Sequence, residues 1–121
     1  MTDLLEEPFV ALPHEAGALR DHWLALEDRG GHPVRIGAEA STADQAFEAV
    51  ATGHGVVLLA EGNVSVYARP GIVCRPVIGV RPSQLAIAWR RGDHRASVRE
   101  FVGAAADAAA KSEQRTALEV G

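Results

Sequence analysis

Six residues with polar or turn-forming side chains follow three short apolar runs, and they are the best candidates for binding chemistry. They are Pro13 and His14, Ser41 and Thr42, and Glu61 and Asn63. If the three runs are strands of one parallel sheet, all six residues lie beyond the carboxyl ends of the strands, where open parallel sheets bind ligands. Ser41 and Thr42 supply hydroxyl donors. The first two pairs also open predicted helices, whose free N–H groups and dipole favour an anion such as a carboxylate.

Each of these residues also has a purely structural interpretation, and both interpretations stay open. Thr42 followed by Gln45 resembles a capping box, in which the hydroxyl accepts from a free backbone N–H and the glutamine reaches back. Ser41 is a second capping candidate. His14 is equally consistent with a solvated loop residue. Glu61 would repel a carboxylate ligand unless its side chain points away.

No pattern of residues in the chain indicates catalysis, a cofactor or a metal. The single cysteine, Cys74, lies within an apolar run, where a thiol is usually inert. There is no Gly-x-Ser-x-Gly elbow, phosphate-binding loop or Gly-x-Gly-x-x-Gly fingerprint, and Gly53-x-Gly55 leads into a predicted strand rather than out of one. No Cys/His spacing suggests zinc. We therefore expect neither an enzyme nor a cofactor or metal site.

The composition and charge of the chain argue against binding to DNA or to a membrane. The chain has 121 residues, 47% of them hydrophobic, and a formal net charge of −4, which fits one small domain with an ordinary core. Its arginines are scattered, so we expect no DNA binding by this chain alone. No apolar run is long enough to span a bilayer, and the acidic N-terminus lacks a secretory signal. These features predict a cytoplasmic protein that contacts no membrane.

The first half of the chain alternates strand and helix patterns. Short apolar runs predict strands, a stripe at helical spacing through Leu19 and Trp23 predicts one helix, and a second through Phe47 and Val50 predicts another. The predicted elements are strands 8–12, 34–40 and 56–60, with helices at 15–29 and from Thr42 to about Gly53. This order implies a parallel sheet with helical crossovers.

The second half has fewer regular patterns. Residues 64–68 are consistent with either a strand or one helical turn, and residues 72–78 with an extended segment interrupted by Pro76. Residues 84–89 alternate Leu85, Ile87 and Trp89 on one face, which predicts a strand. Asp93 can cap a last helix with an apolar stripe.

Four stretches together resemble the ligand-sensing domain of LysR-type transcriptional regulators. FEAVATGHGVVLLAEG (47–62) is similar to the family's helix, glycine turn and apolar strand, with Leu59-Ala60-Glu61 where the family usually has Leu-Pro-Glu. GIVCRPVIGVRPSQLAIAWRRGD (71–93) resembles its return segment and Ala-Trp-Arg strand. SVREFV (97–102) is similar to the start of its last helix, and the opening LLEEPFVALP to the start of its second lobe.

The resemblance implies a fold class and a domain plan. The fold would be α/β: a three-layer parallel βαβαβ lobe of a type-2 periplasmic-binding-like domain, plus a returning strand and C-terminal helix from the other, incomplete lobe. Residues 5–71 would form lobe two, and residues 79–121 a remnant of lobe one, within one partial effector-binding domain. The helix-turn-helix and linker helix of full-length members have no counterpart here.

The function that the resemblance implies is the sensing of a small, anionic metabolite by polar residues in the loops described above. This transfer is positional, because the family has no invariant ligand triad. Two alternatives stay open: a dimerisation or protein-interaction module without ligand binding, and a solute-binding protein, which fits the fold but normally carries a signal peptide. A strand at 84–89 without its usual neighbours would expose a sheet edge that invites pairing. We therefore expect a homo-oligomer, domain-swapped or not, in which a partner copy covers residues 84–102.

Overall fold

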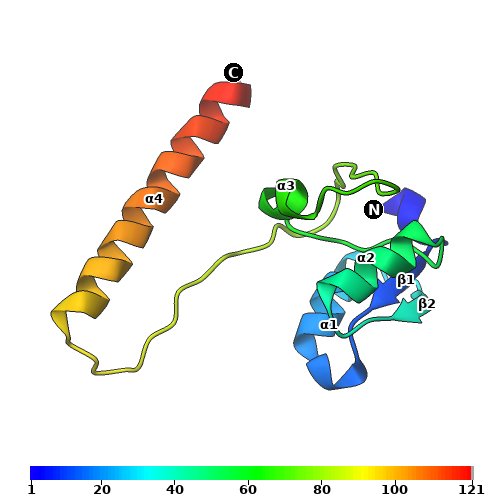
Figure 1. Ribbon diagram of the computed structural model, residues 1–121, viewed down its shortest axis with the longest axis horizontal. Helices are drawn as coiled ribbons and strands as arrows, with labels where there is room; N and C mark the ends of the chain where they lie inside the picture. The colour runs from blue at the N-terminus through cyan, green and yellow to red at the C-terminus, as the bar shows by residue number, and fades with distance from the viewer. Residues whose placement is uncertain (121) are drawn as a thin grey trace. The chain divides into compact units, whose positions relative to one another are not determined.

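The computed structural model describes residues 1–120 of the chain, and the side chains of residues 1–112. The chain divides into two compact units, Met1–Ser83 and Gln84–Gly121. Figure 1 shows the first unit as the part that holds the sheet and helices α1 to α3, and the second as an extended segment followed by helix α4.

A small parallel sheet forms the centre of the first unit. Strand β1 (Pro8–Ala11) pairs in parallel with strand β2 (Arg35–Glu39). Phe9 is opposite Ile36 and Val10 is opposite Ala38, so Gly37 is an extra, unpaired residue that forms a bulge in β2. The pairing continues one residue beyond β2, where the Ala40 N–H donates to the Ala11 carbonyl at 2.8 Å.

The third predicted strand joins this sheet through a single bridge. Phe9 and Val56 are bridged in parallel: the Val56 N–H donates to the Pro8 carbonyl at 2.8 Å, and the Val10 N–H to the Val56 carbonyl at 2.9 Å. The parallel direction of all three segments is as predicted. A full strand at residues 56–60, and with it a three-stranded sheet, is wrong, because β1 is only four residues long and Pro13, soon after it, has no N–H to donate.

The first predicted helix is shorter than expected. Residues 15–29 divide into a 3-10 turn η2 (His14–Ala16), helix α1 (Ala18–Trp23) and a second 3-10 turn η3 (Leu26–Asp28). Ala25 interrupts the helix with a positive φ of 51°, a conformation that costs energy for any residue with a Cβ. The tight turn buries Leu24, which packs with Phe9 and Ala11 in the core and offsets that cost.

Helix α2 (Ala43–Ala51) begins where the sequence predicts. The Thr42 hydroxyl accepts from the Gln45 N–H at 3.2 Å, and the Gln45 side chain accepts from the Ser41 N–H at 2.9 Å. The capping box is thus confirmed, with the glutamine reaching one residue further back than in the usual pattern. After α2 the chain passes so close to the β2 bulge that a Cβ on Gly37 would overlap the His54 carbonyl oxygen.

A buried arginine closes the amino-terminal end of the sheet. Arg29 is 2% exposed, and its guanidinium lies 5.1 Å from the centre of the Phe9 ring. It donates to the carbonyl of Leu5, which precedes β1, at 2.8 Å, and to that of Pro33, which precedes β2, at 3.2 Å. Arg29 therefore ties together the segments that lead into both strands, at the end opposite to the predicted ligand loops.

The rest of the first unit is largely irregular. It begins with the short turn η1 (Thr2–Leu4), and after Val56 it contains the turn η4 (Glu61–Asn63) and helix α3 (Val64–Tyr67). Residues 64–67 are therefore helical, one of the two alternatives left open by the sequence, while Ala68 is extended. Residues 72–78 form no strand, and Arg81 anchors the end of this stretch through ion pairs with Glu27 and Asp28.

The second unit contains one long helix and an unpaired segment. Helix α4 spans Ala96–Val120. The strand predicted at residues 84–89 is wrong, because these residues find no neighbouring backbone to pair with in the described part of the chain, and all of them are exposed. Asp93 does not cap the first turn of α4 directly but binds Arg95, the residue before the helix.

Candidate functional site

The parallel sheet brings the first two predicted loops to one edge. Pro13 and His14 follow the carboxyl end of β1, Ser41 and Thr42 follow that of β2, and the Ala40–Ala11 hydrogen bond of 2.8 Å joins the two strand ends. Figure 1 shows both strands with their arrowheads in the first unit. The parallel bridge at Val56 directs the chain toward the same end of the sheet, and the third loop, with Glu61 and Asn63, follows after the irregular residues 57–60.

The first loop lacks the helix N-terminus that the sequence predicted for anion binding. Pro13 is half-buried, and its carbonyl accepts from the Ala16 N–H at 3.0 Å. His14 is exposed and begins η2, a 3-10 turn of three residues. Because the dipole of an N-terminus needs a longer helix to build up, the argument for anion binding by a helix start applies to α2 and not to this loop.

The second loop retains open donors despite its capping role. The Thr42 hydroxyl and the Ser41 N–H are both occupied by Gln45. No protein partner is found among the described residues for the Ser41 hydroxyl or for the N–H groups of Ala43 and Asp44. These three donors lie at the positive end of α2, where negative charge is stabilised.

The helix that follows the third loop is held against α2. Glu61 and Asn63 are both exposed, and α3 follows them directly. The rings of Tyr67 and Phe47 stack with centroids 4.7 Å apart, and Arg69 pairs with Asp44 in the first turn of α2 at 3.1 Å. Tyr67 and Arg69, which follow the third loop, therefore tie α3 and the residues after it to α2.

Arg20, which no sequence pattern singles out, lies at the ends of β1 and β2. Its side chain is only 14% exposed, and Nη1 donates both to the Leu12 carbonyl and to Glu39 Oε2, the latter at 3.1 Å. Leu12 follows β1 and Glu39 ends β2. Arg20 lies outside the apolar stripe of its helix, so periodicity indicates only a solvated side chain.

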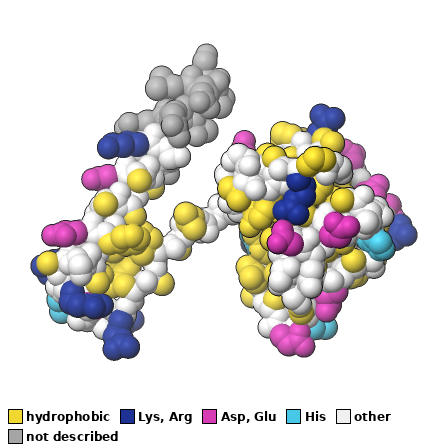
Figure 2. All heavy atoms as spheres, viewed as in Figure 1, with side chains coloured by type: hydrophobic (Ala, Val, Ile, Leu, Met, Phe, Trp, Pro, Cys, Tyr) yellow, Lys and Arg dark blue, Asp and Glu magenta, His cyan; other side chains and the backbone are white. Residues whose placement is uncertain are grey.

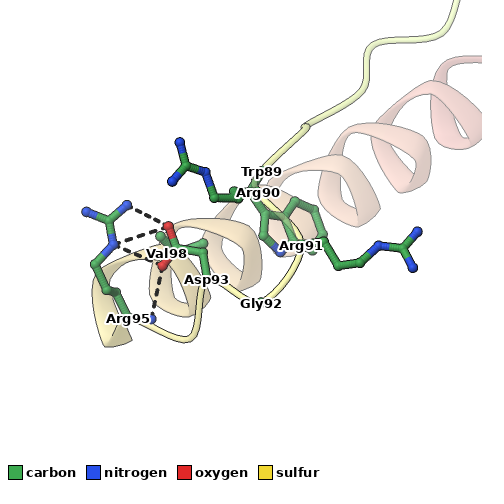
Figure 3. Close-up of a pocket in the computed structure, with 7 residues that line it drawn as sticks. All are labelled: Trp89, Arg90, Arg91, Gly92, Asp93, Arg95 and Val98. Atoms are coloured by element: carbon green, nitrogen blue, oxygen red, sulfur yellow. Dashed lines mark hydrogen bonds and ion pairs between the residues drawn. The ribbon is translucent and has the colours of Figure 1, made fainter.

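The second unit has its own hollow, formed around the turn before α4 (Figure 3). Its lining residues are Trp89, Arg90, Arg91, Gly92, Asp93, Arg95 and Val98. Arg95 donates to both carboxylate oxygens of Asp93, with Nη2 2.6 Å from Oδ2 and Nε 2.9 Å from Oδ1. The Arg95 side chain, and then its backbone N–H, lowers the pKa of Asp93, and the same pair raises the pKa of Arg95. This fork fixes the turn that leads into the helix.

Among the described residues, no group of three or more histidine, cysteine, aspartate or glutamate side chains could hold a metal ion. Cys74 is a free cysteine and is half-buried. No helix in that part of the chain is long and apolar enough to cross a membrane. Polar loops after the carboxyl ends of two parallel strands occupy the position at which open α/β sheets bind small ligands.

The comparison with protein families agrees with this class. The model of the LysR substrate binding domain matches residues 1–110, so the chain belongs to that family, the effector-binding domains of LysR-type transcriptional regulators. The family assignment from the sequence is confirmed, and with it a regulatory, non-enzymatic role. Neither the curated proteins nor the solved structures gave a match to the chain.

Proposed function

We propose that the first unit binds a small anionic effector, such as a carboxylate, at the loop edge formed by Pro13, His14, Ser41, Thr42, Glu61 and Asn63. The observation that carries this proposal is the parallel pairing of three segments around β1. Parallel pairing directs the three following loops to one end, so residues distant in sequence can contact one ligand.

The charges at this edge are compatible with an anion. Two of the nearby carboxylates, Glu39 and Asp44, are already paired with Arg20 and Arg69, each at 3.1 Å. Open donors come from the Ser41 hydroxyl and the first N–H groups of α2. Glu61 has no such partner among the described residues, so the ligand's negative group is expected nearer to Ser41 than to Glu61.

Thermal unfolding tests the proposal. The melting temperature would be followed with small carboxylates, such as acetate, benzoate and succinate, against their uncharged amides. A ligand at a hundred times its dissociation constant stabilises the folded state by about 2.7 kcal/mol. The expected result is a rise in melting temperature with at least one carboxylate and none with its amide. Equal or absent shifts across the whole series would refute the anionic site.

A serine variant assigns the effect to the loop edge. Ser41→Ala removes an exposed hydroxyl that has no described partner, so its melting temperature without ligand should be unchanged. Its shift with the binding carboxylate should fall. Ser97→Ala, in the first turn of α4, is the matched control and should keep the full shift. A full shift in Ser41→Ala would place the ligand elsewhere.

A second candidate function is assembly through residues 84–102. Leu85 is fully exposed, Phe101 is 65% exposed and Trp89 is 55% exposed. Figure 2 shows hydrophobic side chains gathered where the extended segment approaches the first turns of α4. An unpaired segment that alternates apolar residues can pair with a second copy of itself, which would satisfy its backbone and cover this face.

Sedimentation at micromolar concentration tests the assembly. The expected species is a homodimer, and Leu85→Asp combined with Phe101→Asp should convert it to a monomer. Val73→Asp is the matched control, since Val73 is 75% exposed in the first unit and should leave the dimer intact. A monomeric wild-type chain would exclude this function and leave effector binding unaffected.

A further inference from the structure

Arg20 joins the ends of both strands at the loop edge through a single nitrogen. Its Nη1 donates to the carbonyl of Leu12 and lies 3.1 Å from Glu39 Oε2. The side chain is 14% exposed, although it comes from a helix whose neighbouring residues Leu19 and Asp21 are exposed. A charged side chain held this far out of water has little freedom to move, so its remaining donors are fixed in space.

Those remaining donors are unused. A guanidinium carries five N–H groups in a planar fork that matches the two oxygens of a carboxylate. Among the described residues, Nε and Nη2 of Arg20 have no hydrogen-bond partner, and Glu39 engages it through one oxygen alone. By contrast, Arg95 donates through both Nε and Nη2 to the two carboxylate oxygens of Asp93. Arg20 is therefore anchored through Nη1, and its Nε and Nη2 remain available to donate hydrogen bonds.

We propose that Arg20 also binds the effector's carboxylate, through Nε and Nη2, beside the donors at Ser41 and the start of α2, and that the Glu39 carboxylate competes with the ligand for its positive charge. This inference rests on the proposed effector site and specifies its ligand chemistry: a planar carboxylate, bound in two-pronged fashion, in preference to the amide of the same shape. Glu39 weakens the attraction for a second anion, which limits affinity for carboxylates in general.

The test is a calorimetric titration of the full chain with acetate and benzoate, and with acetamide and benzamide. In the wild type, at least one carboxylate should bind more tightly than its amide. Arg20→Gln should lower that carboxylate's affinity by about tenfold or more, because hydrogen bonds to charged groups are the strong ones. Glu39→Gln should raise it, by between about 1.5-fold and fivefold for a partly exposed charge.

Two further variants separate recognition from folding. Arg20→Lys keeps the charge and loses the fork, so it should retain carboxylate binding only in part. Arg35→Gln is the matched control: Arg35 begins β2, and its Nη1 donates to the Glu6 carbonyl at 2.8 Å, away from the loop edge. It should leave affinity unchanged. If Arg20→Gln proves unfolded, Arg20→Lys and Glu39→Gln still carry the test.

The outcomes distinguish this inference from the site on which it rests. No binding of any carboxylate to the wild type would overturn both. Binding that Arg20→Gln and Arg35→Gln reduce equally, or that Glu39→Gln weakens, would overturn the role of Arg20 and leave the effector site standing. A merely structural Arg20–Glu39 pair predicts loss in both Arg20→Gln and Glu39→Gln, so the opposite signs are the decisive result.

Discussion

Replacing Gly37 with alanine tests how α2 and the segment after it sit against the sheet. Gly37 is the bulged residue of β2, and a Cβ there would overlap the His54 carbonyl oxygen and lie 3.0 Å from the Pro8 side chain. The first obstacle is backbone, which cannot rotate away as a flexible side chain would. Gly37→Ala must therefore displace the turn that follows α2, or the bulge itself.

The magnitude follows from two opposing terms. Inserting a methyl group into a filled space costs about 1–3 kcal/mol, and replacing glycine gains about 0.4–1 kcal/mol by restricting the unfolded chain. We expect a net loss of about 2 kcal/mol, because the clash is with backbone. For a unit the size of Met1–Ser83, that is a fall in melting temperature of about 8–16 °C.

The assay is thermal and urea unfolding of Gly37→Ala beside Gly62→Ala. A Cβ on Gly62 would meet nothing within 4 Å, so the same chemical change there should leave the melting temperature unchanged or raise it slightly. If Gly37→Ala is as stable as Gly62→Ala, the turn after α2 does not lie against the β2 bulge. The close packing of the turn between α2 and Val56 against the sheet would then be wrong.

Three other predictions concern the core, the helix start and the second unit. Phe9→Ala empties the fully buried centre of the sheet and should lower the free energy of unfolding by about 3–5 kcal/mol in urea; a cost below about 1 kcal/mol would mean that Phe9 is not central. Thr42→Ala should cost about 1 kcal/mol, while Thr42→Ser keeps the capping hydroxyl and should cost little; equal losses would contradict the cap. The pKa of Asp93 is lowered in the folded state, so the stabilisation that its charge brings is complete above the ordinary carboxyl pKa of about 3.9 and is lost as the pH falls through the lowered value. In an NMR titration, the midpoint of the Asp93 carboxyl should rise in Arg95→Gln. An unchanged midpoint would exclude the ion pair as the cause.

Local signals in the sequence predicted the first unit well where short-range chemistry decides the structure. The pair Thr42 and Gln45 defined the start of α2, and the alternation of apolar runs defined the parallel direction of three segments. The helix predicted over residues 15–29 failed at Ala25, because burial of Leu24 in the core outweighed the helical preference of the local residues. A tertiary contact of this kind cannot be predicted from the spacing of apolar residues along the chain.

In the second unit, the local pattern of residues predicted a strand that does not form. Residues 84–89 carry the alternation of a strand, but a strand needs a neighbouring backbone, and the described part of the chain supplies none. The alternation of apolar residues therefore cannot by itself predict a strand, because a strand also needs a second backbone with which to pair.

The position of the loop edge could be predicted from the sequence, but the side chains that would bind a ligand there could not all be identified. Topology alone places the loops after β1 and β2 together, so His14 and Ser41 could be chosen from the sequence. That they bind a ligand remains a prediction. Arg20 could not be found in advance, because its place between Leu12 and Glu39 depends on how α1 packs across the strand ends.

The most direct test of the account is NMR measurement of scalar couplings across hydrogen bonds in the labelled chain. In a parallel ladder, the two bonds of one residue go to the residues on either side of its partner, whereas an antiparallel ladder directs both to a single residue. The structure predicts coupling of the Val56 amide to the Pro8 carbonyl, of the Val10 amide to the Val56 carbonyl, and of the Ala40 amide to the Ala11 carbonyl. Coupling of both Val56 groups to one residue of β1 would contradict the shared loop edge.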